Sequence, residues 1–277
     1  MGETSIHPSA VVEKGARLGA GVSIGPFCHV GPDVTLGDGV ELIGSVTILG
    51  QTSLGQGGRV FPGAVLGCEP QNHAHKGGPS TLEIGKNASI REGVTMHTGT
   101  DTARGRTTIG DDCHFLAFSH VAHDCDIGNR VTLTQGAVLG GHCVVGDAAI
   151  LGGLAAVHQF VRIGHHAFVG GMTGVERDLI PYGMVTGNRA RLRGLNLVGM
   201  RRAGMARQDI HAVRAAYKLI FETAGPLPDR IERAREAFGN CDPVMDIIAF
   251  MTSDARRKFV MPPVAGRNRP DDGDDEA

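Results

Sequence analysis

The sequence is poor in aromatic residues, with no Trp, two Tyr and ten Phe among 277 residues. It has no apolar run long enough to span a membrane and no segment with the pattern of a signal peptide, so we expect a cytoplasmic protein without integral membrane contact. Its basic residues are not interleaved with aromatic ones, which disfavours nucleic acid as a partner. Its six cysteines are scattered without a CxxC pair, as is typical of reduced core thiols.

Glycine, by contrast, is abundant, and the 42 glycines accompany a strict six-residue period. An aliphatic residue returns at every sixth position from Ile6 to Leu66. The phase is reset after a loop at 67–81 and again after a loop at 101–108, and it then holds to Val175. Neither a helix nor an ordinary strand has this period. Such hexads are typical of a parallel β-helix, in which three hexads close one triangular coil, so side chains three hexads apart should stack at about 4.8 Å.

The chain changes character after residue 187. Residues 188–260 show helical periodicity, with a helix over Asp209–Phe221, a second helix capped by Asp229 and a third with Asp242 as its N-cap and Pro243 as its first residue. Residues 261–277 are rich in Pro, Gly and acidic residues and are predicted to be a disordered tail. Residues 1–187 carry 11 basic and 16 acidic side chains, whereas 188–260 carry 14 basic and 8 acidic ones. The basic segment predicts an anionic partner, although a solvated helix face would have the same composition.

Several histidines cluster in the middle of the hexads. His123 and Asp124 fall on the turn side of their hexad, so we expect them to face outward, and His142 should stack on Asp124 because it lies three hexads later. A carboxylate beside a histidine favours a general base. Gly141, three hexads after His123, places a backbone amide where it could donate to an oxyanion. Spacing alone leaves open the alternative of surface histidines on a turn.

Four stretches carry a resemblance to a known family, namely Ser119–Asp124, Ile24–Cys28, Gly152–Phe160 and Ala215–Ile220. Together they resemble the UDP-N-acetylglucosamine O-acyltransferases, which catalyse the first step of lipid A biosynthesis. The resemblance runs from about Ser5 to Phe259. It implies an all-β, left-handed parallel β-helix over 1–187, a small α-helical C-terminal domain over 188–260, and a homotrimer with active sites between subunits.

The resemblance also implies a role for each candidate residue. His123 matches the catalytic base, which takes the proton of the sugar 3-hydroxyl as it attacks an acyl thioester; Asp124 matches its supporting carboxylate and Gly141 the oxyanion-binding amide. The positions that match contacts to the sugar nucleotide or the acyl chain are Asn72, His120, His142, His158, Gln159, Gly171, Asn196 and Arg202. The acyl donor would be carried on the phosphopantetheine of acyl carrier protein, an acidic partner that the basic segment would steer. No metal and no further cofactor is implied.

Some positions depart from the family's pattern, and they cluster on the sugar side. Asn72 stands where the family usually has Asp, and Ala74 where it has Lys, while the family's His-Arg-Gly-Thr is here His97-Thr98-Gly99-Thr100. An amide-forming transfer to a 3-amino UDP-sugar therefore stays open. Three less favoured hypotheses also stay open: the later N-acyltransferase of the pathway, a β-helical zinc lyase with His120, His123 and His142 as ligands, and a non-catalytic scaffold.

Overall fold

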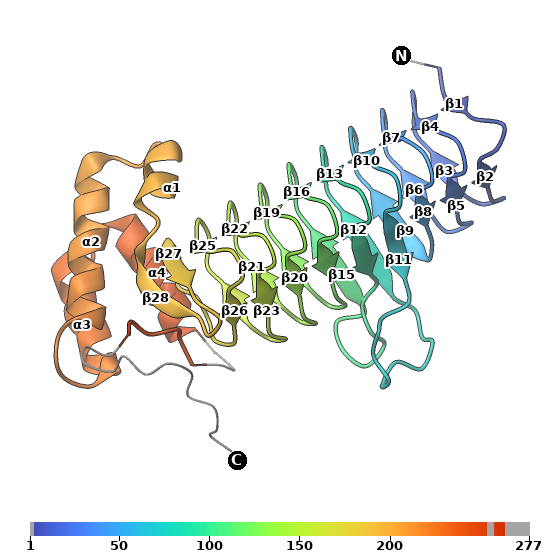
Figure 1. Cartoon of the computed structure of the whole chain (residues 1–277). Helices are drawn as coiled ribbons and strands as arrows, with labels where there is room; N and C mark the ends of the chain where they lie inside the picture. The colour runs from blue at the N-terminus through green and yellow to red at the C-terminus, as the bar shows by residue number, and fades with distance from the viewer. Residues whose placement is uncertain (1–2, 254–257, 264–277) are drawn as a thin grey trace.

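The computed structural model describes residues 3–253 and 258–263, which form a triangular prism of parallel strands followed by helices (Figure 1). Each hexad gives one short strand, and every third strand pairs within the same sheet. Partners along the regular coils are three hexads apart, as in Ser23↔Glu41 and Thr132↔Ile150. The predicted coil of three hexads is therefore confirmed.

The prism has three faces, which we call A, B and C. Face A contains β1 Ser5–Ile6, β4 Ser23–Ile24, β7 Glu41–Leu42, β10 Arg59–Val60, β13 Ser89–Ile90, β16 His114–Phe115, β19 Thr132–Leu133, β22 Ile150–Leu151, β25 Phe168–Val169, β27 Gly183–Thr186 and β28 Arg191–Leu195. Face B contains β2 Val11–Val12, β5 His29–Val30, β8 Thr47–Ile48, β11 Val65–Cys68, β14 Thr95–His97, β17 His120–Val121, β20 Val138–Leu139, β23 Ala156–Val157 and β26 Gly174–Val175. Face C contains β3 Arg17–Leu18, β6 Thr35–Leu36, β9 Gln51–Leu54, β12 Thr81–Ile84, β15 Arg106–Ile109, β18 Asp126–Ile127, β21 Val144–Val145 and β24 Arg162–Ile163.

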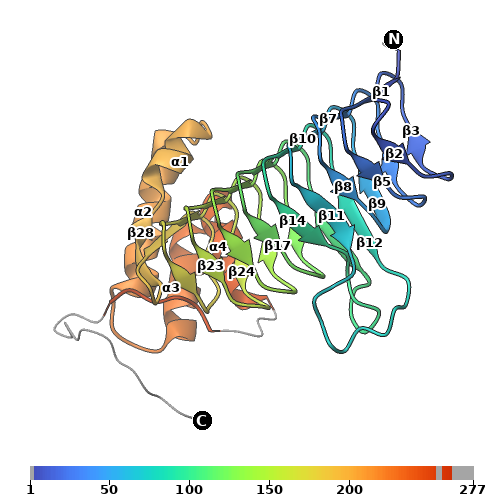
Figure 2. The ribbon, with the colours of Figure 1, turned by 45° about the vertical axis from the view of Figure 1, so that its right-hand side comes forward.

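Two loops interrupt the coils where the hexad phase is reset. The first loop, 69–80, joins β11 to β12, and the second loop, 98–105, joins β14 to β15. Across them the pairing passes over the inserted residues and continues, as in Leu66↔Met96 and Leu82↔Thr107. Each loop is thus an insertion that leaves the pairing of the coils intact. Both emerge from the same edge of the prism, as Figures 1 and 2 show.

The core is a column of side chains along the prism axis. The inward hexad positions are almost fully buried, and Phe115 is among the largest of them. Cys28, Cys113, Cys125 and Cys143 are buried and unpaired, as predicted. At the corners the backbone takes the left-handed conformation, which Gly, Asn and Asp tolerate most readily. Larger residues adopt it here as well, among them Leu154 with φ 58°, because the repeat imposes the turn whatever its side chain.

The described residues of the C-terminal part form four helices, α1 Leu197–Arg202, α2 Arg207–Phe221, α3 Leu227–Phe238 and α4 Asp242–Thr252. Two predicted starts are displaced. Asp229 lies within the first turn of α3, whose N-cap is Pro226, and Asp242 is the first residue of α4 rather than its cap. The antiparallel hairpin of β27 and β28 was not predicted. Of the predicted tail 261–277, residues 264–277 lie outside the described ranges.

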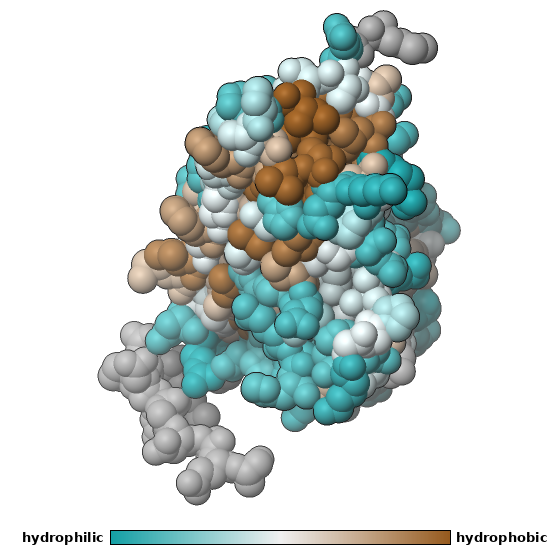
Figure 3. All heavy atoms as spheres, turned by 90° about the vertical axis from the view of Figure 1, so that its right-hand side faces the viewer, coloured by the Kyte–Doolittle hydropathy of each residue, from teal (hydrophilic) through white to brown (hydrophobic). Residues whose placement is uncertain are grey.

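The N-terminal end of the prism is open. Ile6 is 45% and Val11 is 56% exposed there, and Figure 3, which faces this end, shows apolar side chains gathered on it. At the other end the prism is tied to the helices by Arg162, whose guanidinium bonds the buried Asp178 at 2.7 Å and lies over the ring of Phe250 in α4. Within residues 3–253 and 258–263, no helix combines the length and the apolarity needed to cross a bilayer.

Candidate active site

A ladder of three side chains marks the corner between faces B and C. Asp124, His142 and Phe160 occupy the same turn on three successive coils, and all three have a left-handed backbone, with φ between 59° and 65°. The ring of His142 stacks on that of Phe160 at 4.4 Å and meets the ring of His123 edge-on at 5.0 Å. The corner therefore holds His142 beside His123.

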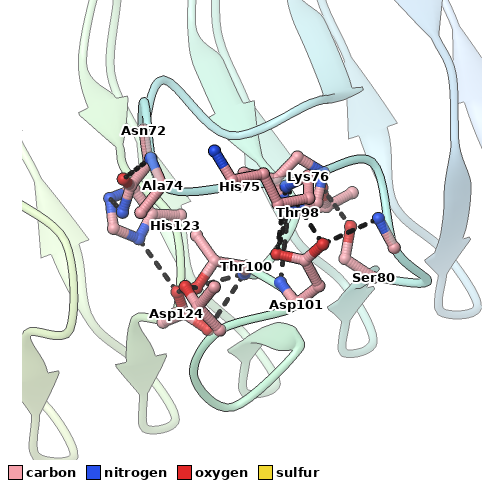
Figure 4. A network of polar contacts seen from close by, with 12 residues as sticks. Asn72, Ala74, His75, Lys76, Ser80, Thr98, Thr100, Asp101, His123 and Asp124 are labelled. Atoms are coloured by element: carbon pink, nitrogen blue, oxygen red, sulfur yellow. Dashed lines mark hydrogen bonds and ion pairs between the residues drawn. The ribbon is translucent and has the colours of Figure 1, made fainter.

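The side chains of His123 and Asp124 form a hydrogen-bonded pair, Nδ1 to Oδ2 at 2.9 Å (Figure 4). Both residues are buried, which corrects the expectation that this turn faces solvent. The reason is the second loop: the backbone N–H of Thr100 donates to both oxygens of Asp124 at 3.1 Å, and its hydroxyl donates to Oδ2 at 2.8 Å. A fixed acceptor on Nδ1 leaves Nε2 of His123 as the atom able to accept a proton.

The first loop places Asn72 on the other side of the same ring. Its Nδ2 lies 3.5 Å from Nε2 of His123, and its Oδ1 accepts the backbone N–H of Ala74 at 2.9 Å. Because Oδ1 is engaged by a donor, the amide presents its N–H groups to His123. A donor facing Nε2 and an acceptor facing Nδ1 select the tautomer with the proton on Nδ1. That tautomer is the one a general base requires here.

His123 lines a cavity of about 330 Å³ between successive coils. Four other predicted residues, His120, Gly141, His158 and Gln159, line the same cavity. Its remaining walls are Gln71, His97, Ala122, Gly140 and Val157. The cavity thus brings His123 together with four of the residues predicted to contact the substrates or the oxyanion. Gln71 and His97 were missing from the predicted contacts, although His97 belongs to the histidine cluster of the sequence.

His97 and His120 form a fixed pair on adjacent coils of face B. Their ring centroids are 5.3 Å apart; Nδ1 of His97 bonds the carbonyl of Glu69 at 2.7 Å, and Nδ1 of His120 bonds the hydroxyl of Thr95 at 2.8 Å. Burial, followed by the neighbouring His97 and His123, lowers the pKa of His120 to about 4. At neutral pH His120 is therefore an uncharged hydrogen-bonding group. This suits recognition of neutral sugar hydroxyls rather than of phosphate.

Gly141 lies against His123, as the three-hexad spacing predicts. A Cβ at position 141 would come 2.5 Å from Cε1 and 2.7 Å from Nε2 of the imidazole. The amides on either side are used by the coils, Gly140 donating to Val157 and His142 to His123, whereas no hydrogen bond from the Gly141 amide occurs within the described residues. A free donor next to the base can stabilise an oxyanion formed there.

The other predicted contacts lie elsewhere in the chain. Asn196 and Arg202 line a separate cavity of about 680 Å³ between face A and α1. Asn196 caps α1 through a bond from the Gly199 amide and also donates to the carbonyl of His166, both at 2.9 Å. Gly171 is exposed at the corner between faces A and B. In a triangular prism, face A is opposite the corner that carries His123.

The ligand atoms of His123, Asp124 and His142 all lie within 4.8 Å of one another, so this cluster has the donors for a divalent metal. It is not the set expected of the zinc lyase, because His120 is outside it and bonds Thr95 instead. A carboxylate held by Thr100 serves equally well to orient an imidazole. The predicted absence of a metal stays a prediction.

The fold and the repeat define the class of the chain. A profile described as the six-repeat bacterial transferase hexapeptide matches residues 15–50 and 106–141. The chain is a hexapeptide-repeat protein, and its fold is the predicted left-handed parallel β-helix with a small helical C-terminal domain.

More specific similarity covers nearly the whole length. A profile described as UDP-N-acetylglucosamine O-acyltransferase, domain 2, matches residues 178–260. The acyl-[acyl-carrier-protein]–UDP-N-acetylglucosamine O-acyltransferase of Bartonella henselae is 47% identical over 266 residues, 96% of this chain and 97% of the relative; that of Brucella ovis is 53% identical over 264 residues, 95% of each. The chain belongs to the UDP-N-acetylglucosamine O-acyltransferase family, which confirms the resemblance stated above.

Solved structures of UDP-N-acetylglucosamine acyltransferases have the same fold as this chain. The UDP-N-acetylglucosamine acyltransferase of Campylobacter jejuni superposes with a TM-score of 0.88 at 36% identity, covering 94% of this chain and 100% of that one. The Francisella novicida enzyme of the same name gives a TM-score of 0.90 at 32% identity, covering 94% and 95%.

Proposed function

We propose that the protein transfers a 3-hydroxyacyl group from acyl carrier protein to the 3-hydroxyl of UDP-N-acetylglucosamine, the first step of lipid A biosynthesis. The observation that carries this proposal is His123, which lines the cavity of about 330 Å³ and is hydrogen-bonded to Asp124, within a chain of this family. The carboxylate fixes the proton on Nδ1, and Nε2 faces the space where a substrate hydroxyl would lie. No cofactor is needed beyond the phosphopantetheine of the donor.

The reaction follows from this geometry. Nε2 of His123 takes the proton of the sugar hydroxyl as its oxygen attacks the thioester carbonyl carbon. The carbonyl electrons move to oxygen, and the amide of Gly141 donates to the oxyanion. Collapse of the intermediate forms the ester and breaks the C–S bond, and the departing thiolate recovers the proton from Nε2. The neutral His120 would hydrogen-bond the sugar.

The site is completed by a second copy of the chain. His123 at the B/C corner and Asn196 with Arg202 above face A lie on opposite sides of one prism, so they cannot enclose one substrate within a single chain. A closed ring of three copies would set face A of each against the B/C corner of the next. The base would then come from one subunit and the contacts to uridine and phosphate from its neighbour. This arrangement is the homotrimer that the family resemblance implies.

A mixing experiment tests the assembly. His123→Ala and Asn196→Ala chains, each inactive alone, are co-expressed in equal amounts. If sites form between subunits, about a quarter of them combine an intact His123 with an intact Asn196, so about a quarter of the wild-type activity returns. If each site lies within one chain, the mixture stays inactive.

The reaction itself is tested by identifying the product. Purified protein receives a mixture of 3-hydroxyacyl carrier proteins with either UDP-N-acetylglucosamine or its 3-amino analogue, and the products are analysed by mass spectrometry. An O-acylated UDP-N-acetylglucosamine supports the proposal and gives the acyl length. Amide product from the analogue alone would mean that Asn72, Ala74 and Thr98 mark an acceptor site for the amino sugar. No product, together with stoichiometric zinc, would favour the lyase.

A further inference from the structure

The two inserted loops lie side by side next to the His123–Asp124 pair (Figures 2 and 4). They come from adjacent coils, and each holds one side of the catalytic ring. The first loop brings Asn72 towards Nε2 of His123, and the second brings Thr100 to Asp124. The geometry of the base therefore depends on how the loops are fixed to each other.

One side chain makes most of that connection. The carboxylate of Asp101 in the second loop accepts the backbone N–H of Lys76 at 3.0 Å and that of Gly78 at 2.9 Å, and it contacts Nδ1 of His75 at 3.1 Å. A second link runs from the hydroxyl of Ser80 to that of Thr98 at 2.9 Å. Three partners on one carboxylate make a strong attachment, because hydrogen bonds to a charged acceptor exceed neutral ones.

The Asp101 carboxylate is suited to this role in its ionised form. The bond from the Gly78 amide, with further bonds from Lys76 and His75, lowers its pKa. The side chains of His75 and Asp101 are 8% and 18% exposed, although Asp101 as a whole residue lies at the surface of the loop. Asp101 directly follows Thr100 at the start of a turn, so two consecutive residues attach to Asp124 on one side and to the first loop on the other.

We propose that Asp101 is a positioning residue for the acyl transfer, holding the first loop so that Asn72 stays against Nε2 of His123. This rests on the proposed function. Asp101 is not among the residues that line the cavity. It acts through Asn72, whose amide would accompany the acceptor hydroxyl at Nε2. The coils pair across both loops without help from them, as Leu66↔Met96 shows, so loss of the contact frees the loop without opening the prism.

The test is a double-mutant cycle on kcat/KM for the sugar nucleotide, with Asp101→Ala, Asn72→Ala and the double variant. A misplacement of about 1 Å near a reacting atom costs up to about 100-fold, so each single variant should lose roughly ten- to a hundredfold. If Asp101 acts through Asn72, the double variant is no worse than Asn72→Ala. Losses that multiply would overturn the proposal, because Asp101 would then act independently of Asn72.

Two further variants separate positioning from folding. Asp101→Asn keeps one acceptor oxygen and should lose less than Asp101→Ala. Asp38→Ala is the matched control, since the Asp38 carboxylate also accepts a backbone N–H, that of Ala20 at 2.8 Å, but in the N-terminal coils; its kcat/KM should equal that of the wild type. Amide hydrogen exchange should rise in 69–80 alone for Asp101→Ala. Unchanged exchange in 69–80 would refute the role of Asp101 in holding the first loop, whether or not the wild type forms product. A wild type that forms no product would refute the proposed function instead.

Discussion

Replacement of Gly141 by Ala tests whether the position of the imidazole limits the reaction. The new Cβ would lie 2.5 Å from Cε1 and 2.7 Å from Nε2 of His123. Ordinary contact needs about 3.5 Å, so the ring must move by roughly 1 Å. The 2.9 Å bond to Asp124 and the edge-on contact with His142 oppose that movement. A displacement of about 1 Å costs on the order of 100-fold, equivalent to about 2.7 kcal/mol in the activation free energy.

The assay is the initial rate of acyl transfer at saturating donor, with thermal unfolding measured on the same preparation. Gly141 has no positive φ, so the Ala backbone is unstrained and the fold should survive. Gly31→Ala is the control, because a Cβ there would meet its nearest atoms at 3.4–3.5 Å, an ordinary contact. A Gly141→Ala rate within about threefold of the wild type would refute the reasoning, since it would mean that the ring position is not critical.

Asp124→Asn should lower turnover by at least about 100-fold while leaving the KM values close to wild type, because the imidazole loses its oriented acceptor. Steady-state kinetics measures both values, and a turnover equal to that of the wild type would mean that the pair is only structural. Burial lowers the pKa of His120 to about 4, and the unfolded chain binds that proton near pH 6.5, so stability should fall as the pH drops from about 6.5 to about 4. His120→Gln should flatten this part of the thermal-unfolding profile, and an unchanged slope would exclude His120 as its source. Asp178→Ala should lower the free energy of unfolding by about 3 kcal/mol in denaturant titration, because it removes the carboxylate that pairs with the guanidinium of Arg162 at the domain junction; a loss below about 1 kcal/mol would show that water replaces the carboxylate.

The sequence period was enough to predict the prism and the contacts along it. An inward hexad position and a spacing of three hexads place Asp124 under His142 and Gly141 against His123, because the parallel coils repeat regularly after the second loop. The resets of phase likewise indicated where both insertions occur, although the loops were expected at 67–81 and 101–108 and lie at 69–80 and 98–105. These are local rules, and they hold wherever the repeat holds.

What lies over the outward positions could not be predicted in the same way. Thr100 reaches Asp124 across 24 residues and Asn72 reaches His123 across 51, and no periodicity relates these positions. The loops therefore bury a pair that the hexad pattern assigns to the surface. Two helix starts also differ from the prediction: Pro226 and Cys241 are the N-caps of α3 and α4, and Asp229 and Asp242 lie within the first turns.

The most direct test of the account compares the wild type with His123→Ala in one assay of O-acyl UDP-N-acetylglucosamine formation by mass spectrometry. A general base contributes about 10²–10⁴ in rate, so the variant should lose at least 100-fold while its unfolding temperature and oligomeric state are unchanged. A wild-type enzyme that forms the ester and a folded His123→Ala variant that forms it at a similar rate would contradict the assignment of His123 as the base.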